Sequence, residues 1–177
     1  MKLLILDRDG VINFDSDAYI KHPDEWRPIP GSLDAIALLT QVGWRIVVAT
    51  NQSGVGRGLF DMATLNAINT KMHKAVTQAG GRIEAVFYCP DTDESHSPNR
   101  KPAPGMFLAI AERFNLPLAN APAIGDSLRD LQAAAAAGAQ PILVLTGKGT
   151  KTRAAGKLPA GTVIHSDLAA AARALSQ

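Results

Sequence analysis

Six short runs of apolar and β-branched residues, separated by segments with helical periodicity, constrain the fold of this chain most strongly. The runs are Lys2–Leu6, Trp44–Ala49, Ile83–Cys89, Ala121–Gly125, Ile142–Leu145 and Thr162–His165. Strands that are apolar on both faces and alternate with helices are typical of a parallel sheet covered on both sides. The sequence therefore predicts an α/β fold, a Rossmann-like three-layer sandwich with a mainly parallel central sheet.

Helix start and stop signals lie between these runs. Five helices are expected: Ser32 to about Val42, Asp61 to about Ala79, Pro104 to Phe114, Ser127 to Gly138 and Asp167 to Leu175. Ser127 and Asp130 have the spacing of a capping box. Two stretches without periodicity, Asp91–Arg100 and Lys148–Gly161, are expected to be connecting loops. Residues 1–177 are expected to form one domain.

Composition limits the function. The net charge is only +2, and the basic residues are scattered, which argues against nucleic acid or an anionic membrane as a partner. A small anionic substrate remains compatible. No signal-peptide pattern and no apolar stretch of about 20 residues is present, and the single cysteine, Cys89, excludes an internal disulfide. We expect a cytoplasmic, monomeric protein.

Two carboxylates follow the first apolar run. Asp7 and Asp9 stand two residues apart and are followed by Gly10, which permits a tight turn. Close carboxylates repel each other unless a cation lies between them, and oxygen ligands favour a hard ion such as Mg²⁺. The alternative is a strand followed by a simple Asp-Gly turn, in which both side chains only accept backbone hydrogen bonds.

Three further polar clusters follow apolar runs or precede helices. Thr50 and Asn51 end the second run and offer hydroxyl and amide groups to a phosphate, although turn chemistry alone also explains them. Lys101 precedes a proline that stiffens its backbone, although an isolated lysine is usually a surface residue. Asp126 lies at a strand end and suits a metal, whereas Asp130, one helical turn later, is either a metal-site residue or only a helix cap.

The four clusters occur in the order found in one known family. The strings DRDGVIN, TNQSGVGRG, RKPAPGM and GDSLRD resemble the haloacid dehalogenase-like phosphohydrolases over about residues 2–146. They look most like the D-glycero-D-manno-heptose 1,7-bisphosphate phosphatase family, and the histidinol phosphatases are close to it. The resemblance implies a phosphoric monoester hydrolase that acts on a small sugar phosphate in lipopolysaccharide precursor synthesis. Histidinol-phosphate phosphatase, or a non-catalytic phosphate-binding protein of the same fold, is the alternative.

The resemblance also implies roles for individual residues. Asp7 would be the nucleophile that forms an aspartyl-phosphate, and Asp9 the general acid and base. Mg²⁺ would be held by Asp7, the main-chain carbonyl of Asp9 and Asp126. Thr50 and Lys101 would bind the transferring phosphoryl group. Asn51, Arg57 and Arg100 are candidates for contacts with the sugar or its second phosphate.

Two departures from the wider family are expected. About 40 residues separate Asp9 from Thr50, and they already hold a helix and a strand, so no cap domain fits there. Many relatives carry a structural zinc held by three cysteines and one histidine in the loop before Lys101. This loop offers only Cys89 and His96 of that set, so we expect no structural zinc, a surface position for His96 and a core position for Cys89.

Overall fold

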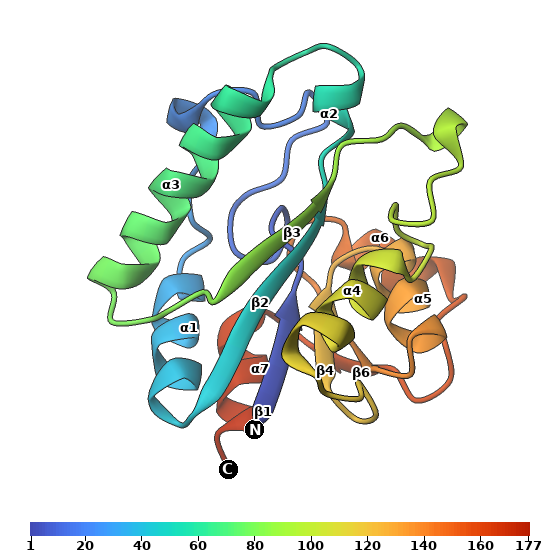
Figure 1. Ribbon diagram of the computed structural model, residues 1–177. Coiled ribbons are helices and arrows are strands. Elements are labelled where there is room, and N and C mark those ends of the chain that lie inside the picture. Colours follow the sequence, from blue (N-terminus) through green and yellow to red (C-terminus); the bar gives the residue numbers. More distant parts are fainter.

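A computed structural model describes all residues 1–177 and contains one six-stranded sheet with helices on both faces (Figure 1). The strands are β1 (Lys2–Leu6), β2 (Trp44–Asn51), β3 (Ala85–Cys89), β4 (Pro122–Gly125), β5 (Gln140–Val144) and β6 (Val163–His165). Their order is β3-β2-β1-β4-β5-β6, and every neighbouring pair is parallel. The predicted three-layer α/β architecture is confirmed.

The alternation of side chains along the strands divides the core into two clusters. In β1, Leu4 and Leu6 belong to a cluster of 21 buried residues on one face, and Leu3 and Ile5 to a cluster of 13 on the other. The larger cluster is covered by α1 (Ser32–Gln41), α3 (Met62–Gln78) and α7 (Leu168–Leu175), and the smaller one by α4 (Gly105–Phe114) and α5 (Leu128–Ala136). Both faces of β1 are therefore covered by buried apolar side chains.

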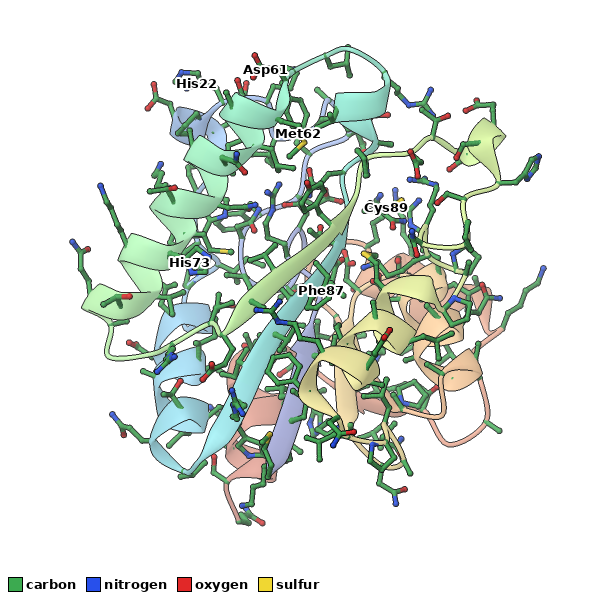
Figure 2. All side chains as sticks on the ribbon, in the orientation of Figure 1. His22, Asp61, Met62, His73, Phe87 and Cys89 are labelled. Atoms are coloured by element: carbon green, nitrogen blue, oxygen red, sulfur yellow. The ribbon has the colours of Figure 1, made fainter.

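Most helix caps agree with the sequence, and one does not. Asp61 accepts a hydrogen bond from the Thr64 N–H at the start of α3, where Figure 2 labels it. Ser32, however, is not a cap. Gly31, at φ 87°, precedes α1, and the Ser32 hydroxyl donates to the Val11 carbonyl at 2.8 Å. The hydroxyl thus ties the start of α1 to the turn that follows β1, a contact that no local pattern reveals.

The two expected connecting loops contain short helices. The Lys148–Gly161 segment was predicted to lack helix, but α6 (Gly149–Ala155) lies inside it and ends at Gly156, at φ 71°. Only Gly149 of this helix is buried, so no apolar periodicity signals it. The Asp91–Arg100 segment includes the 3-10 turn η2 (Asp93–Ser95). Two further short helices, η1 (Pro23–Glu25) and α2 (Ser53–Gly56), complete the structure.

The strand order places a crevice beside β1. From β1 the chain passes to β2 and β3 on one side, and later to β4, β5 and β6 on the other. Ligands of such sheets bind at the carboxyl ends of the strands, where the order reverses. The segment between β1 and β2 contains only η1 and α1, so no separate cap domain covers this edge. Both chain termini lie at the opposite end of the sheet (Figure 1).

Candidate active site

A cleft of about 240 Å³ opens at the carboxyl ends of the central strands. Its wall is almost entirely polar. All of the residues proposed from the sequence line it, namely Asp7, Asp9, Thr50, Asn51, Arg57, Arg100, Lys101 and Asp126. Four segments that are far apart in the chain thus meet at one place.

Lys101 lies in the innermost part of this cleft, with only 3% of its side chain exposed. Its ammonium nitrogen is 3.1 Å from Asp7 Oδ1 and 2.7 Å from Asp130 Oδ1, and it donates to the Ala49 carbonyl at 2.8 Å. Three acceptors therefore fix the ammonium group beside the Asp7 carboxylate. The usual reading of an isolated lysine as a surface residue does not hold here.

Asp130 accepts hydrogen bonds at the start of its own helix and also pairs with Lys101. Its Oδ2 accepts from the main-chain N–H groups of Asp126 and Ser127 and from the Ser127 hydroxyl, at 3.1, 3.0 and 2.9 Å. Its Oδ1 faces Lys101. Both oxygens are therefore occupied by protein donors, so the side chain is more than a helix cap.

Asp7, Asp126 and Asp130 form the acidic group with the geometry of a metal site. One carboxylate oxygen from each lies within 4.8 Å of the other two. Because Asp130 is already engaged by Lys101 and by main-chain donors, Asp7 and Asp126 are the carboxylates best suited to a hard cation. The donor set, all oxygen with no thiolate or imidazole, fits Mg²⁺.

Asp9 is held away from this acidic group by neutral and cationic donors. Its Oδ1 accepts from Arg8 Nε at 2.8 Å and from Asn13 Nδ2 at 2.9 Å. Its Oδ2 accepts from Gln52 Nε2 at 3.1 Å and from an Arg8 terminal nitrogen at 3.3 Å. Arg8 is fully buried and also donates to Asn69. The two carboxylates of the DxDG motif therefore differ in their surroundings: Asp7 lies beside two other carboxylates as well as Lys101, whereas Asp9 lies among donors only.

The pKa values follow from these surroundings. Burial, together with the charge of Asp130, raises the pKa of Asp7 to about 7 and that of Asp126 to about 8. Burial also acts to raise the pKa of Asp9, but the Arg8 guanidinium and the hydrogen bonds to Asp9 outweigh it and hold that pKa below its usual range. Burial acts to lower the pKa of Lys101, and the Asp130 and Asp7 carboxylates reverse this, so Lys101 remains an ammonium ion.

Two glycines bring the main chain against Asp126. A β-carbon at Gly10 would lie 2.1 Å from Asp126 Oδ2, and one at Gly147 would lie 2.2 Å from the same oxygen. The Lys148 N–H donates to this oxygen at 2.8 Å, and the Thr146 hydroxyl donates to the Gly10 carbonyl at 2.6 Å. The β5–α6 connection therefore positions Asp126, and the close approach requires glycine on both sides.

Several known proteins similar to this chain over its whole length are phosphatases. The polynucleotide kinase 3 phosphatase family matches residues 2–128, and the HAD-hydrolase-like family matches residues 98–171. The D-glycero-beta-D-manno-heptose-1,7-bisphosphate 7-phosphatase of Bordetella bronchiseptica is 60% identical over 177 residues, covering 100% of this chain and 99% of the relative. The protein of that name from Pseudomonas putida is 54% identical, over 99% of each chain. The chain belongs to the D-glycero-D-manno-heptose 1,7-bisphosphate phosphatase family of the haloacid dehalogenase-like hydrolases.

Solved structures agree. The crystal structure of D,D-heptose 1,7-bisphosphate phosphatase from B. bronchiseptica, complexed with magnesium and phosphate, superposes with a TM-score of 0.98 at 60% identity and covers 99% of this chain and 98% of that one. The corresponding structure from Burkholderia thailandensis has a TM-score of 0.80 at 56% identity, over 99% and 98% of the two chains. The haloacid dehalogenase-like fold and phosphatase class implied by the motifs are thereby confirmed.

The three residues proposed to contact the sugar or its second phosphate, Asn51, Arg57 and Arg100, differ in their burial and in their partners. The Asn51 side chain is already paired with the main chain of Lys101: its Nδ2 donates to the Lys101 carbonyl and its Oδ1 accepts from the Lys101 N–H, both at 3.0 Å. Asn51 thus positions Lys101 whether or not it also contacts substrate. Arg57 is exposed, 3.9 Å from Glu94. Arg100 is buried, pairs with Asp93 and donates to the Asp91 carbonyl.

Several residues of the site were not proposed from the sequence. Gln52 and Asn13 hold Asp9, and Arg129 and Lys148 line the cleft. Gln52 and Asn13 lie inside the TNQSGVGRG and DRDGVIN strings, so the motifs themselves point to them. Arg129 lies inside the GDSLRD string and is the second residue of α5, so its motif points to it as well. Lys148 lacks such a signal, because only the folded β5–α6 connection brings it to the edge of the cleft.

Cys89 and His96 lie in the segment before Lys101, for which the sequence predicts no structural zinc. Cys89 is buried at the end of β3, as expected, and burial raises the pKa of its thiol (Figure 2). Its sulfur lies 3.6 Å from Asp91 Oδ2 and 3.9 Å from Ser97 Oγ. His96 is exposed, also as expected. The absence of zinc remains a prediction.

The remaining histidines lie outside the site. Figure 2 labels His22 and His73 on the α3 side of the molecule, and neither lines the cleft. Among the helices, none combines the length and the apolar character that crossing a lipid bilayer requires.

Proposed function

We propose that this chain hydrolyses the C7 phosphate of D-glycero-β-D-manno-heptose 1,7-bisphosphate. The observation that carries the proposal is the Asp7–Lys101–Asp126 arrangement within a chain that matches phosphatases of that name from end to end. The proposal includes a place in the synthesis of lipopolysaccharide core precursors. It also includes a cytoplasmic monomer that uses Mg²⁺ and lacks structural zinc.

Asp7 is proposed as the nucleophile. A carboxylate oxygen of Asp7 attacks phosphorus while the bond from phosphorus to the C7 oxygen breaks, which gives an aspartyl-phosphate and a sugar alkoxide. Its Oδ1 already accepts from the Arg8 N–H at 2.8 Å and faces Lys101. These contacts fix the orientation of the carboxylate before substrate arrives.

Asp9 is proposed as the acid that protonates the departing C7 alkoxide. A phosphoryl dianion placed beside a carboxylate favours its protonated form, which is the form this step needs. The ionised Asp9 then takes a proton from water as that water attacks the aspartyl-phosphate. The bond from phosphorus to Asp7 breaks, and inorganic phosphate leaves. The hydrogen bonds from Arg8, Asn13 and Gln52 favour the ionised form required for the second half.

Asp7, Asp126 and the main-chain carbonyl of Asp9 are proposed to hold Mg²⁺. Bound there, the ion would neutralise the repulsion between the acidic group and a phosphate dianion. Thr50 and the Lys101 ammonium are proposed to bind the oxygens of the transferring phosphoryl group, where negative charge is spread in the transition state.

The second phosphate is proposed to bind at the basic side of the cleft. Arg57, Arg100 and Arg129 all line it. The first two come from the β2–α3 and β3–α4 connections, and the third from the first turn of α5. Their acidic neighbours Asp93 and Glu94 lie on the η2 segment. An arginine can bind a phosphate with two parallel hydrogen bonds, so a terminal phosphate competes well with these carboxylates.

Phosphate release from three substrates tests the function. Heptose 1,7-bisphosphate, histidinol phosphate and a 3′-phosphorylated DNA oligonucleotide are compared with Mg²⁺ and with excess chelator. We expect Mg²⁺-dependent release, fastest from the heptose bisphosphate and absent in Asp7→Asn. The matched control is Asp61→Asn, which keeps a capping side chain on α3 far from the cleft. Faster release from either other substrate would overturn the proposed specificity.

A further inference from the structure

Gln52 lies between two groups that the proposed reaction uses. It follows β2, is 5% exposed, and its main-chain N–H donates to the Cys89 carbonyl at 2.7 Å. Its side-chain nitrogen is 3.1 Å from Asp9 Oδ2 and 2.9 Å from Thr50 Oγ1. One amide therefore bridges the turn after β1 and the end of β2.

The direction of both hydrogen bonds is fixed by chemistry. An ionised carboxylate only accepts hydrogen bonds, so the side of the amide that faces Asp9 must be the NH₂ group. That nitrogen has two hydrogens, and Asp9 and Thr50 receive one each. Gln52 has no further N–H to give, so its nitrogen acts on substrate through these two neighbours.

This arrangement determines what the Thr50 hydroxyl can do. Because its oxygen accepts from Gln52, its own hydrogen is available to another acceptor. Within the protein, that hydrogen has only the Asn51 carbonyl, at a long 3.4 Å. Thr50 lines the cleft, so a phosphoryl oxygen there is the stronger acceptor for its O–H.

Gln52 also fixes Asp9 from the β2 side. Arg8 and Asn13 hold the Asp9 carboxylate from within its own turn. Gln52 adds the contact that links this carboxylate to the strand carrying Thr50. The distance between Asp9, the proposed acid and base, and Thr50, the proposed phosphoryl ligand, therefore depends on the Gln52 side chain.

We propose that Gln52 is a positioning residue for phosphoryl transfer: it keeps Thr50 as a hydrogen-bond donor to phosphate and fixes Asp9 relative to it. This inference rests on the proposed phosphatase function. It assigns no contact between Gln52 and the substrate. A side chain that only fills space would affect stability but would not act through Thr50.

A double-mutant cycle with Gln52→Met and Thr50→Val tests this role. We expect Gln52→Met to lower kcat about 10- to 100-fold, because two hydrogen bonds in a buried site are lost, with a much smaller change in KM. Calorimetric binding of inorganic phosphate in the presence of Mg²⁺ should weaken about 10-fold in Gln52→Met. In the Thr50→Val background the same substitution should leave phosphate binding unchanged within about twofold, because Gln52 acts through that hydroxyl.

Controls separate the possible failures. Gln78→Met repeats the substitution at an exposed position of α3 and should behave as wild type. If Gln52→Met loses its cooperative melting transition, Gln52→Leu, which is shorter and carries no hydrogen-bond donor, replaces it with the same expectation for kcat. If the wild type releases phosphate and the Gln52 variant keeps the same kcat and the same phosphate affinity, the inference is refuted and the proposed function stands. If wild type releases no phosphate, the proposed function fails, and the phosphate-binding cycle then decides only whether Gln52 acts on bound phosphate through Thr50.

Discussion

The floor and the rim of the cleft are built on different principles. The floor, defined as Asp7, Asp9, Thr50, Lys101, Asp126 and Asp130, consists of side chains that are buried or nearly so and are bonded to one another or to the main chain. The rim, defined as Asp15, Asp17, Tyr19, Arg57, Arg129 and Lys148, is half-buried or exposed. The floor fixes geometry before substrate binds, whereas the rim can adapt to the sugar and its second phosphate.

Loss of a floor cation should have the largest effect. Lys101→Met should lower kcat by about 10³-fold, because a charge that stabilises the transferring phosphoryl group is removed. It should also reduce the free energy of unfolding by about 3 kcal/mol, since Asp7 and Asp130 lose a buried partner. Steady-state kinetics and urea denaturation measure the two effects.

The rim counterpart of this substitution is Lys148→Met. The Lys148 ammonium lies 3.6 Å from Asp15, and 44% of its side chain is exposed. Such an ion pair contributes at most about 1 kcal/mol, so the unfolding midpoint should barely change. Equal destabilisation by Lys101→Met and Lys148→Met would show that floor and rim do not differ as described.

The acidic floor should also respond to pH. The raised pKa values of Asp7, about 7, and Asp126, about 8, mean that the folded, metal-free protein holds protons that the unfolded chain releases above about pH 4. The stability from these two groups is complete below pH 4 and is lost as pH rises through 7 to 8. Mg²⁺ binds the ionised carboxylates, so it should raise the melting temperature more at pH 8 than at pH 5.

Scanning calorimetry of wild type and Asp126→Asn isolates this effect. The amide stands in for the protonated carboxyl, so the variant should be more stable than metal-free wild type at pH 8 and similar to it at pH 5. It should also lose most of the stabilisation by Mg²⁺. A wild-type advantage over Asp126→Asn at pH 8 without metal would contradict the assigned direction of the pKa.

Rim arginines should affect binding rather than chemistry. Arg57→Met and Arg129→Met should each raise KM for the heptose bisphosphate about 10-fold with little change in kcat, because a charged hydrogen bond to the second phosphate is lost. A small monophosphate such as p-nitrophenyl phosphate lacks that group and should show no change. Arg113→Met on α4 is the matched control. Equal loss with both substrates would place these arginines at the reacting phosphate instead.

The smallest effects are expected from removing the polar side chains at the starts of α5 and α3. Ser127→Ala should cost about 1 kcal/mol of stability, because the Ser127 hydroxyl donates to Asp130 at 2.9 Å at the start of α5. It should also lower kcat a few-fold, since Asp130 orients Lys101. Asp61→Ala should cost a similar amount at the start of α3 without changing kcat. Thermal melts and turnover of both variants distinguish a floor contact from a simple cap.

The floor was accessible from the sequence because its residues follow local signals. Asp7, Thr50 and Asp126 each come at or directly after an apolar run, and parallel strands bring such ends together. Lys101 was harder, since its place depends on Asn51, fifty positions earlier, pairing with its main chain. The proline after Lys101 indicated only a stiff local backbone, and the family resemblance assigned its role in binding phosphate.

The remaining features depend on contacts that no window of sequence contains. Helix α6 has no apolar stripe and forms where Gly149 meets the main chain of Val144. Ser32 looks like a cap but bonds to Val11, because the preceding glycine takes the turn. Lys148 reaches the rim only when the β5–α6 connection folds over the sheet edge. Tertiary contact thus overrides local preference at these positions.

The close contact of Gly10 and Gly147 with Asp126 bears on how the chain matures. All of the floor residues have been synthesised once residue 130 is made, yet the cradle of Asp126 still lacks Gly147 and the Lys148 N–H. A nascent chain that stops before Lys148 therefore carries all four sequence motifs without the main-chain contacts that position the Asp126 carboxylate. On the proposed function, catalytic competence is expected only after the β5–α6 connection has been synthesised.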